Sequence, residues 1–128
     1  MTEKETPTEE GVDYNALFEE AESPEMAKAD TDAPTWIKVL DEEHYLVKTR
    51  SGIYKLKELE WGRVERARKR AGDKGNPNEF ILADSIVGHD GKKAKYGELD
   101  IRGWKGSTVM RLATALTIIY GVDDFLGQ

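Results

Sequence analysis

Cysteine is absent from the chain of 128 residues, so disulfide bonds, thiolate nucleophiles and thiolate metal sites are excluded. Histidine is scarce: His44 and His89 lie far apart, and neither has the spacing of a zinc motif. Long apolar runs are also missing, because the most apolar stretch, residues 113–122, is about half a membrane span in length. The first residues lack the basic and apolar segments of a secretory signal. We therefore expect no membrane partner and a protein that stays where it is made.

Residues that could carry catalysis do not converge in the sequence. The neighbouring carboxylates at 41–43 and 123–124 indicate solvated surface charge at a turn and near a chain end. Residues 103–108, Gly-Trp-Lys-Gly-Ser-Thr, match a phosphate-binding loop only in part, because the lysine precedes the second glycine, and helix capping is the simpler interpretation. We therefore predict no enzyme activity, no cofactor and no metal site.

Charge is distributed unevenly along the chain. Residues 1–34 hold eleven acidic and two basic side chains, a net charge of −9, whereas residues 35–128 have a net charge of +3. This pattern predicts a largely disordered acidic arm over 1–34, joined to a single α+β domain over 35–128. Within the arm, Tyr14, Leu17 and Phe18 have the spacing of one helix face, which predicts a short helix at 12–22 that folds against a groove.

The body has the pattern of a small antiparallel β-meander followed by three α-helices. Three β-prone runs at 36–40, 44–49 and 53–56 are separated by turn residues. Helical periodicity predicts helices over 59–71, 77–87 and 107–120; Ser107 or Thr108 would cap the last helix, and Gly121 would end it. Residues 93–104 are not assigned to an element.

Two features of the body allow more than one interpretation. Basic residues on the first predicted helix form a patch that could contact a phosphate backbone; they are Arg63, Arg66, Lys69 and Arg70. Interleaved glutamates such as Glu65 favour a solvated face with ion pairs instead. The tryptophans at 36, 61 and 104 favour a core role, with a peptide-binding groove as the alternative.

The order of these elements resembles the tail assembly chaperones of long-tailed bacteriophages over residues 37–121. The resemblance rests on the β region 45–59, the segment 79–87 (EFILADSIV), an Asp-Gly turn followed by Gly-Glu-Leu at 97–99, and the closing helix 106–120. Such a resemblance implies a non-enzymatic protein of the host cytoplasm that coats the tape measure protein, and in some cases tail tube subunits, before the tail assembles.

For a chaperone of this kind, we expect a partner, or a second copy in a homo-oligomer, to bind residues of the apolar stripes near the C-terminus and at the start of the first predicted helix. They are Trp61, Val64, Leu112, Leu116, Ile119, Tyr120 and Phe125. Tyr14, Leu17 and Phe18 would occupy the groove until the client displaces them. Two alternatives stay open at this point. One is a structural virion component such as a tail or head-completion protein; the other is a nucleic-acid-binding regulator that uses the helix Arg63–Arg70.

Overall fold

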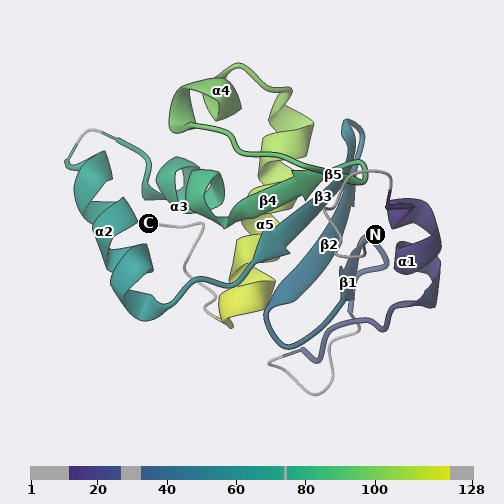
Figure 1. Ribbon diagram of the computed structural model, residues 1–128. Coiled ribbons are helices and arrows are strands. Elements are labelled where there is room, and N and C mark those ends of the chain that lie inside the picture. The colour runs from purple at the N-terminus through teal and green to yellow at the C-terminus, as the bar shows by residue number, and fades with distance from the viewer. Residues whose placement is uncertain (1–11, 27–32, 74, 122–128) are drawn as a thin grey trace, which may run out of the picture.

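The computed structural model describes residues 12–26, 33–73 and 75–121 (Figure 1). In chain order its elements are α1 (Tyr14–Glu20), β1 (Ile37–Val39), β2 (His44–Thr49), β3 (Gly52–Lys57), α2 (Trp61–Ala71), α3 (Pro77–Ser85), β4 (Ile86–His89), β5 (Lys92–Lys93), α4 (Glu98–Arg102) and α5 (Gly106–Tyr120). The protein is of the mixed α+β class, as predicted. The order differs in detail, because β4, β5 and α4 interrupt the predicted run of three helices.

The sheet is antiparallel throughout, and its strands lie in chain order from β1 to β5. The predicted meander corresponds to β1, β2 and β3. Between β1 and β2, the Asp41 carboxylate accepts hydrogen bonds from the backbone N–H groups of Glu43 (2.9 Å) and His44 (3.0 Å). Aspartate favours turns for this reason, and the acidic stretch therefore separates two strands.

β4 is a correction to the predicted helix 77–87. The helix α3 ends at Ser85, and the next four residues are a strand that pairs with β3. Asp90 (φ 51°) and Gly91 (φ 91°) then both have positive φ, as a two-residue type I′ hairpin turn requires. The β-branched pair at 86–87 before Asp-Gly is a hairpin signal, but an apolar run of this length fits a buried helix equally well by periodicity.

The predicted cap of the last helix is wrong, although its end is predicted correctly. α5 begins at Gly106, and its N-terminus has no side-chain cap. Thr108 is instead fully buried, and its hydroxyl is hydrogen-bonded to that of Ser51 at 2.7 Å. Gly121 follows α5 in the left-handed conformation (φ 69°), which favours glycine because it has no β-carbon.

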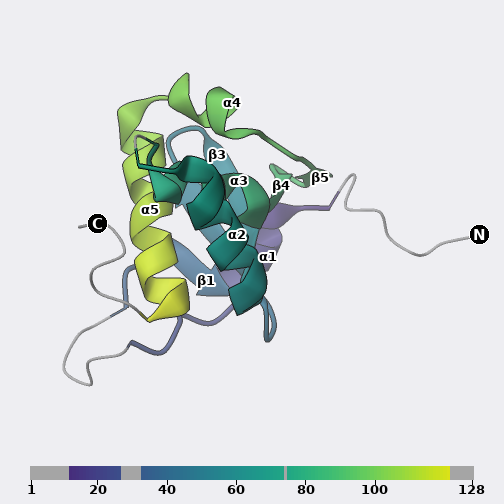
Figure 2. The same cartoon turned by 90° about the vertical axis from the view of Figure 1, so that its left-hand side faces the viewer.

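The two faces of the sheet contact different helices, because successive side chains of a strand point to opposite sides. On the inner face, Val47 pairs with Ile37 and Tyr54, and these residues pack into a core shared with α2, α3, α4 and α5. On the outer face, Leu46 and Ile53, here called the outer-face pair, pack against α1. Figures 1 and 2 show α5 crossing one side of the sheet and α1 on the other.

Candidate functional site

α1 is a short amphipathic helix held on the outer face. The Asp13 carboxylate accepts a hydrogen bond from the backbone N–H of Ala16 (3.2 Å), as an N-cap does. Tyr14 and Phe18 are one helical turn apart, and only 3% and 6% of their surfaces are exposed. Leu17 is half-buried beside them. The structure therefore places the predicted docking motif against the chain's own outer-face pair.

Two glycines on the β4–β5 hairpin make room for this helix. A β-carbon at Gly88 would overlap the hydroxyl of Tyr14. At Gly91 it would overlap the carbonyl oxygen of Val12, whose N–H donates to the Gly91 carbonyl at 3.3 Å. Because glycine has no β-carbon, the Tyr14 side chain and the Val12 backbone can approach the hairpin closely. A larger residue at either glycine position would push them away.

The segment after α1 follows the edge of the sheet. The N–H of Val39 donates to the carbonyl of Glu22 at 2.7 Å, and this contact is an isolated antiparallel bridge. The Lys38 ammonium donates to the carbonyl of Ala21 at 3.2 Å. These bonds connect α1 to β1, and a surface depression remains between them and the rest of the molecule.

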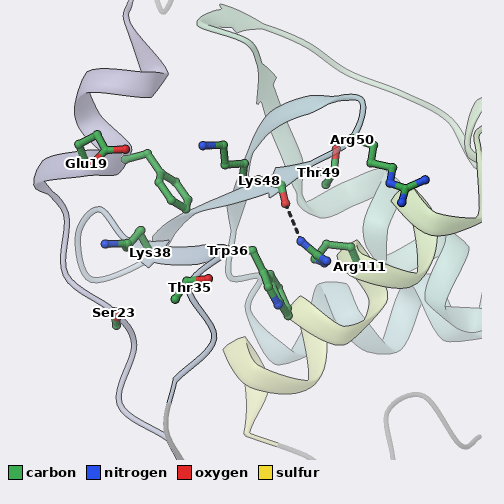
Figure 3. Close-up of a pocket in the computed structure, with 10 residues that line it drawn as sticks. Glu19, Ser23, Thr35, Trp36, Lys38, Lys48, Thr49, Arg50 and Arg111 are labelled. Carbon is green, nitrogen blue, oxygen red and sulfur yellow. Dashed lines mark hydrogen bonds between the residues drawn. The ribbon is translucent and has the colours of Figure 1, made fainter.

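A cleft of about 620 Å³ opens there, between α1, the sheet and α5 (Figure 3). Side chains from α1, β1, β2 and α5 line it, so segments far apart in the sequence meet at this place. Its charged lining residues are Lys38, Lys48, Arg50, Arg111 and Glu19. Four cations against one carboxylate make it a basic cleft, the name used below.

Aromatic rings hold three of these cations in position. The Lys38 and Lys48 ammonium groups each lie 5.5 Å from the centre of the Phe18 ring. The guanidinium of Arg111 lies 4.8 Å from the centre of the Trp36 ring, and it donates to the Lys48 carbonyl at 3.2 Å (Figure 3). Such cation–π contacts are favourable and restrict the side chains. The cleft is therefore a basic surface with partly fixed geometry.

Sequence reasoning missed the basic residues of this cleft. A signal was present, because lysine alternates with apolar residues in β1 and β3, and the register places Lys38, Leu46 and Lys55 side by side on the outer face. That alternation predicts a basic face. It does not predict that Arg111 of α5 reaches around the edge of the sheet to complete it.

The residues predicted to contact a partner have diverse positions. Four of them are buried in the inner-face core: Val64, Leu112, Leu116 and Ile119. Tyr120 is half-buried, and its hydroxyl accepts a hydrogen bond from the backbone N–H of Leu59 (2.8 Å). Trp61, at the start of α2, is 67% exposed. Phe125 lies outside the described residues. Among those described, Trp61 is the member that a partner reaches most easily.

The predicted basic patch lies on α2 and has mixed surroundings. Arg66 and Lys69 are exposed. The Arg70 guanidinium lies 3.3 Å from the Asp84 carboxylate of α3, so this cation belongs to an ion pair. Arg63 is half-buried and lines a second cleft, of about 500 Å³, beside β4. The four side chains of the patch therefore do not share one open surface.

Both histidines have neighbours within hydrogen-bonding distance. His44 Nδ1 lies 2.9 Å from the Asp41 carboxylate in the exposed β1–β2 turn. The His89 ring stacks on Tyr54 with 4.0 Å between ring centres, and its Nδ1 lies 2.9 Å from the Tyr96 hydroxyl. The first contact connects the β1–β2 turn to β2, and the others connect β4 to β3 and to the segment that holds Tyr96. Within the described part of the chain, no three His, Asp or Glu side chains are grouped so as to hold a metal ion.

These features define a class: a small α+β protein with a helix bound to one face of its sheet and a basic cleft beside that helix. Comparison with protein-family profiles, with curated proteins and with solved structures found no match to the chain. Among the residues that the structure describes, no helix has the length and apolarity needed to cross a membrane.

Proposed function

We propose that this chain is a tail assembly chaperone of a long-tailed bacteriophage, which binds a helical segment of the tape measure protein on the outer face of its sheet. The observation that carries the proposal is the position of α1, an amphipathic helix bound there through Tyr14 and Phe18. The resemblance over residues 37–121 supports the choice of client. The protein acts by binding and not by catalysis, in the host cytoplasm, and tail tube subunits are a second client.

The outer face has the properties of a helix-binding surface. An apolar pair in its middle contacts two aromatic side chains at positions i and i+4 of a helix, and Gly88 leaves room for a large one. Amphipathic helices are recognised through anchors with this spacing. A client segment with large apolar residues at i and i+4 would therefore make the same contacts as α1.

α1 is suited to being replaced. With seven residues it is too short to be a stable helix on its own, so its structure depends on the surface beneath it. A longer client helix would bury more apolar area on the same surface and would displace it. In the absence of the client, α1 covers Leu46 and Ile53, which would otherwise expose an apolar patch on an open sheet.

The function is tested by co-expression with the tape measure protein from the same genome. We expect a soluble complex that co-purifies at low and at moderate salt, because the contact is mainly apolar. If the two proteins do not co-purify at either salt concentration, the proposed function is wrong. Mass spectrometry of purified particles then separates a chaperone, which should be missing, from a structural virion component, which should be present.

The location of the client site is tested with two variants that displace α1 by different means. Gly88→Ala places a β-carbon against the Tyr14 hydroxyl, and Tyr14→Ala with Phe18→Ala removes both anchors. Tyr14→Ala with Phe18→Ala should raise client affinity about five- to thirtyfold, since the competing helix is lost. Gly88→Ala should lower it, because the added β-carbon also removes the room for the client's own anchor. Leu99→Ala is the matched control. Leu99 is an exposed residue of α4 and is not part of the cluster that contacts α1, so this change should leave client affinity unchanged.

Trp61 provides the competing location. If Trp61→Ala weakens the complex while the α1 variants leave it unchanged, the client binds at α2 and the outer face has another role. If the α1 variants change affinity and Trp61→Ala does not, the outer face is the client site. Titration calorimetry with the purified full-length chain distinguishes the two results.

A further inference from the structure

The basic cleft brings together four cations from segments that are distant in the sequence. Lys38 comes from β1, Lys48 from β2, Arg50 from the turn that follows, and Arg111 from α5. Glu19 is the only acidic residue that lines the cleft in the described part of the chain. Like charges at this density repel one another, and an anion placed between them would remove that cost.

These cations retain hydrogen-bonding capacity. Lys38 donates to the Ala21 carbonyl and Arg111 to the Lys48 carbonyl, which uses one donor group of each. Within the described residues, none of the four takes part in an ion pair. Because lysine has three N–H donors and arginine five, most of the donors of the cleft are left for a ligand.

The aromatic contacts decide which anion fits. Nucleic acid in an open groove gains affinity when bases stack on exposed rings. Here the Phe18 ring is buried beneath two ammonium groups, and the Trp36 ring is next to the Arg111 guanidinium. The rings therefore position cations and do not offer stacking surfaces. A stacked guanidinium retains N–H groups at its edge, in the geometry that binds a carboxylate through two hydrogen bonds.

We propose that the basic cleft is a binding site for an acidic peptide segment, one in which two or more Asp or Glu carboxylates lie close together. Its volume of about 620 Å³ is within the usual range for ligand sites, of about 300–1,000 Å³. The site goes beyond the proposed function, because it is open while α1 is in place and needs no helix to be displaced. An acidic partner thus binds beside the outer face, on the α5 side.

The test is a calorimetric titration of the full-length chain with a hexaglutamate peptide at low ionic strength, and with hexaglutamine as the neutral control. We expect hexaglutamate to bind, with an affinity that falls as salt is added, and hexaglutamine not to bind. The titration is repeated on Glu19→Gln, which removes the carboxylate that lines the cleft and could compete. Absence of hexaglutamate binding in both proteins overturns the proposal.

Charge reversal locates the site. Lys48→Glu with Arg50→Glu should weaken hexaglutamate binding about tenfold or more, because two contacts to charged groups are replaced by repulsion. Arg66→Glu with Lys69→Glu changes the net charge equally on exposed positions of α2, and it should alter affinity less than about twofold. Equal losses in both variants would mean that net charge alone attracts the peptide, and the cleft would have no special role.

Oligothymidylate is the last probe. If it binds more tightly than hexaglutamate, and if the Lys48 and Arg50 variant loses that binding, the cleft is a nucleic-acid site and the peptide proposal is wrong. Weaker or no binding of oligothymidylate supports it. Circular dichroism of each variant confirms that the fold is retained, which is expected because Lys48, Arg50, Arg66 and Lys69 are all exposed.

Discussion

The two faces of the same sheet are covered in different ways. The inner face contributes apolar side chains such as Val47 and Leu56 to one large core, shared with four helices, α2 to α5. The outer face has two apolar residues between lysines, and a single helix of seven residues covers them. Stability therefore comes mainly from the inner face, since apolar burial is the dominant favourable contribution to folding.

This difference indicates where the molecule can change without unfolding. A short element with few buried contacts opens locally at a lower free energy than the core does. α1 is such an element, whereas α5 is not, because Leu112 and Leu116 of α5 are fully buried in the core. The outer face is therefore the part of the protein where a partner can replace an internal contact.

The largest loss of stability is expected from a substitution in the core on the inner face. Leu116→Ala should lower the free energy of unfolding by about 3–4 kcal/mol, because it leaves a cavity at a fully buried position. Met110→Ala on the same helix is the control, since Met110 is 67% exposed and should cost less than about 0.5 kcal/mol. Urea denaturation followed by circular dichroism measures both. Similar losses would contradict the assignment of α5 to the core.

A smaller effect is expected from the outer face. Phe18→Ala should cost about 1–2 kcal/mol, below the usual loss of about 3–5 kcal/mol for a buried phenylalanine, because α1 can detach while the domain stays folded. Adding Tyr14→Ala should then cost less than about 0.5 kcal/mol more, since the helix is already displaced. Hydrogen exchange should show α1 amides less protected than those of α5. Additive losses would mean that α1 is a permanent part of the fold.

Tyr54, on the inner face, should make the stability of the protein depend on pH in the alkaline range. Burial raises the pKa of Tyr54 to about 12, with smaller contributions from Tyr96 and Asp90. Below pH 10 the phenol is neutral in both states, and its full contribution to stability is present. Between pH 10 and 12 the unfolded chain loses this proton first, so the free energy of unfolding falls as pH rises. Thermal melts should show a weaker alkaline decline for Tyr54→Phe than for the unchanged protein.

The smallest effect on stability is expected from an ion pair between α2 and α3, outside both faces of the sheet. Arg70→Gln removes the pair with Asp84, in which the Arg70 side chain is 50% exposed and the Asp84 side chain 15%. It should cost about 0.5 kcal/mol, because solvent screens the guanidinium. This variant sets the scale against which the loss for Phe18→Ala is judged. A loss above about 2 kcal/mol in urea denaturation would mean that the contact between α2 and α3 depends on this ion pair and not on apolar packing.

Much of the fold can be predicted from short segments. The runs that become β1, β2 and β3 alternate or are β-prone, and α2 and α5 have helical periodicity over several turns. The stripe of Tyr14, Leu17 and Phe18 lies in the helix expected at 12–22. β4 could not be predicted in this way, because the apolar residues 86–87 fit a buried helix and a buried strand equally well. Only their pairing with β3 selects the strand.

The candidate site was less predictable than the fold. Residues such as Leu112 and Leu116 have the pattern of a contact stripe, but the same pattern describes a helix buried in a core, and the structure places them there. The basic cleft depends on Arg111 lying beside Trp36, across a separation in sequence that no local pattern describes. A site made by distant segments has no signature in any one of them.

By itself, the sequence determined the elements that depend on nearby residues: the first three strands, the main helices, the glycine that ends α5, and the amphipathic pattern of α1. Only the tertiary structure decided which surface α1 covers, that residues 86–89 are a strand, and that four cations share one cleft. The physical reason is the distance along the chain over which each interaction acts. Propensity, capping and periodicity act within a few turns of chain, whereas burial and charge clustering depend on which distant segments meet.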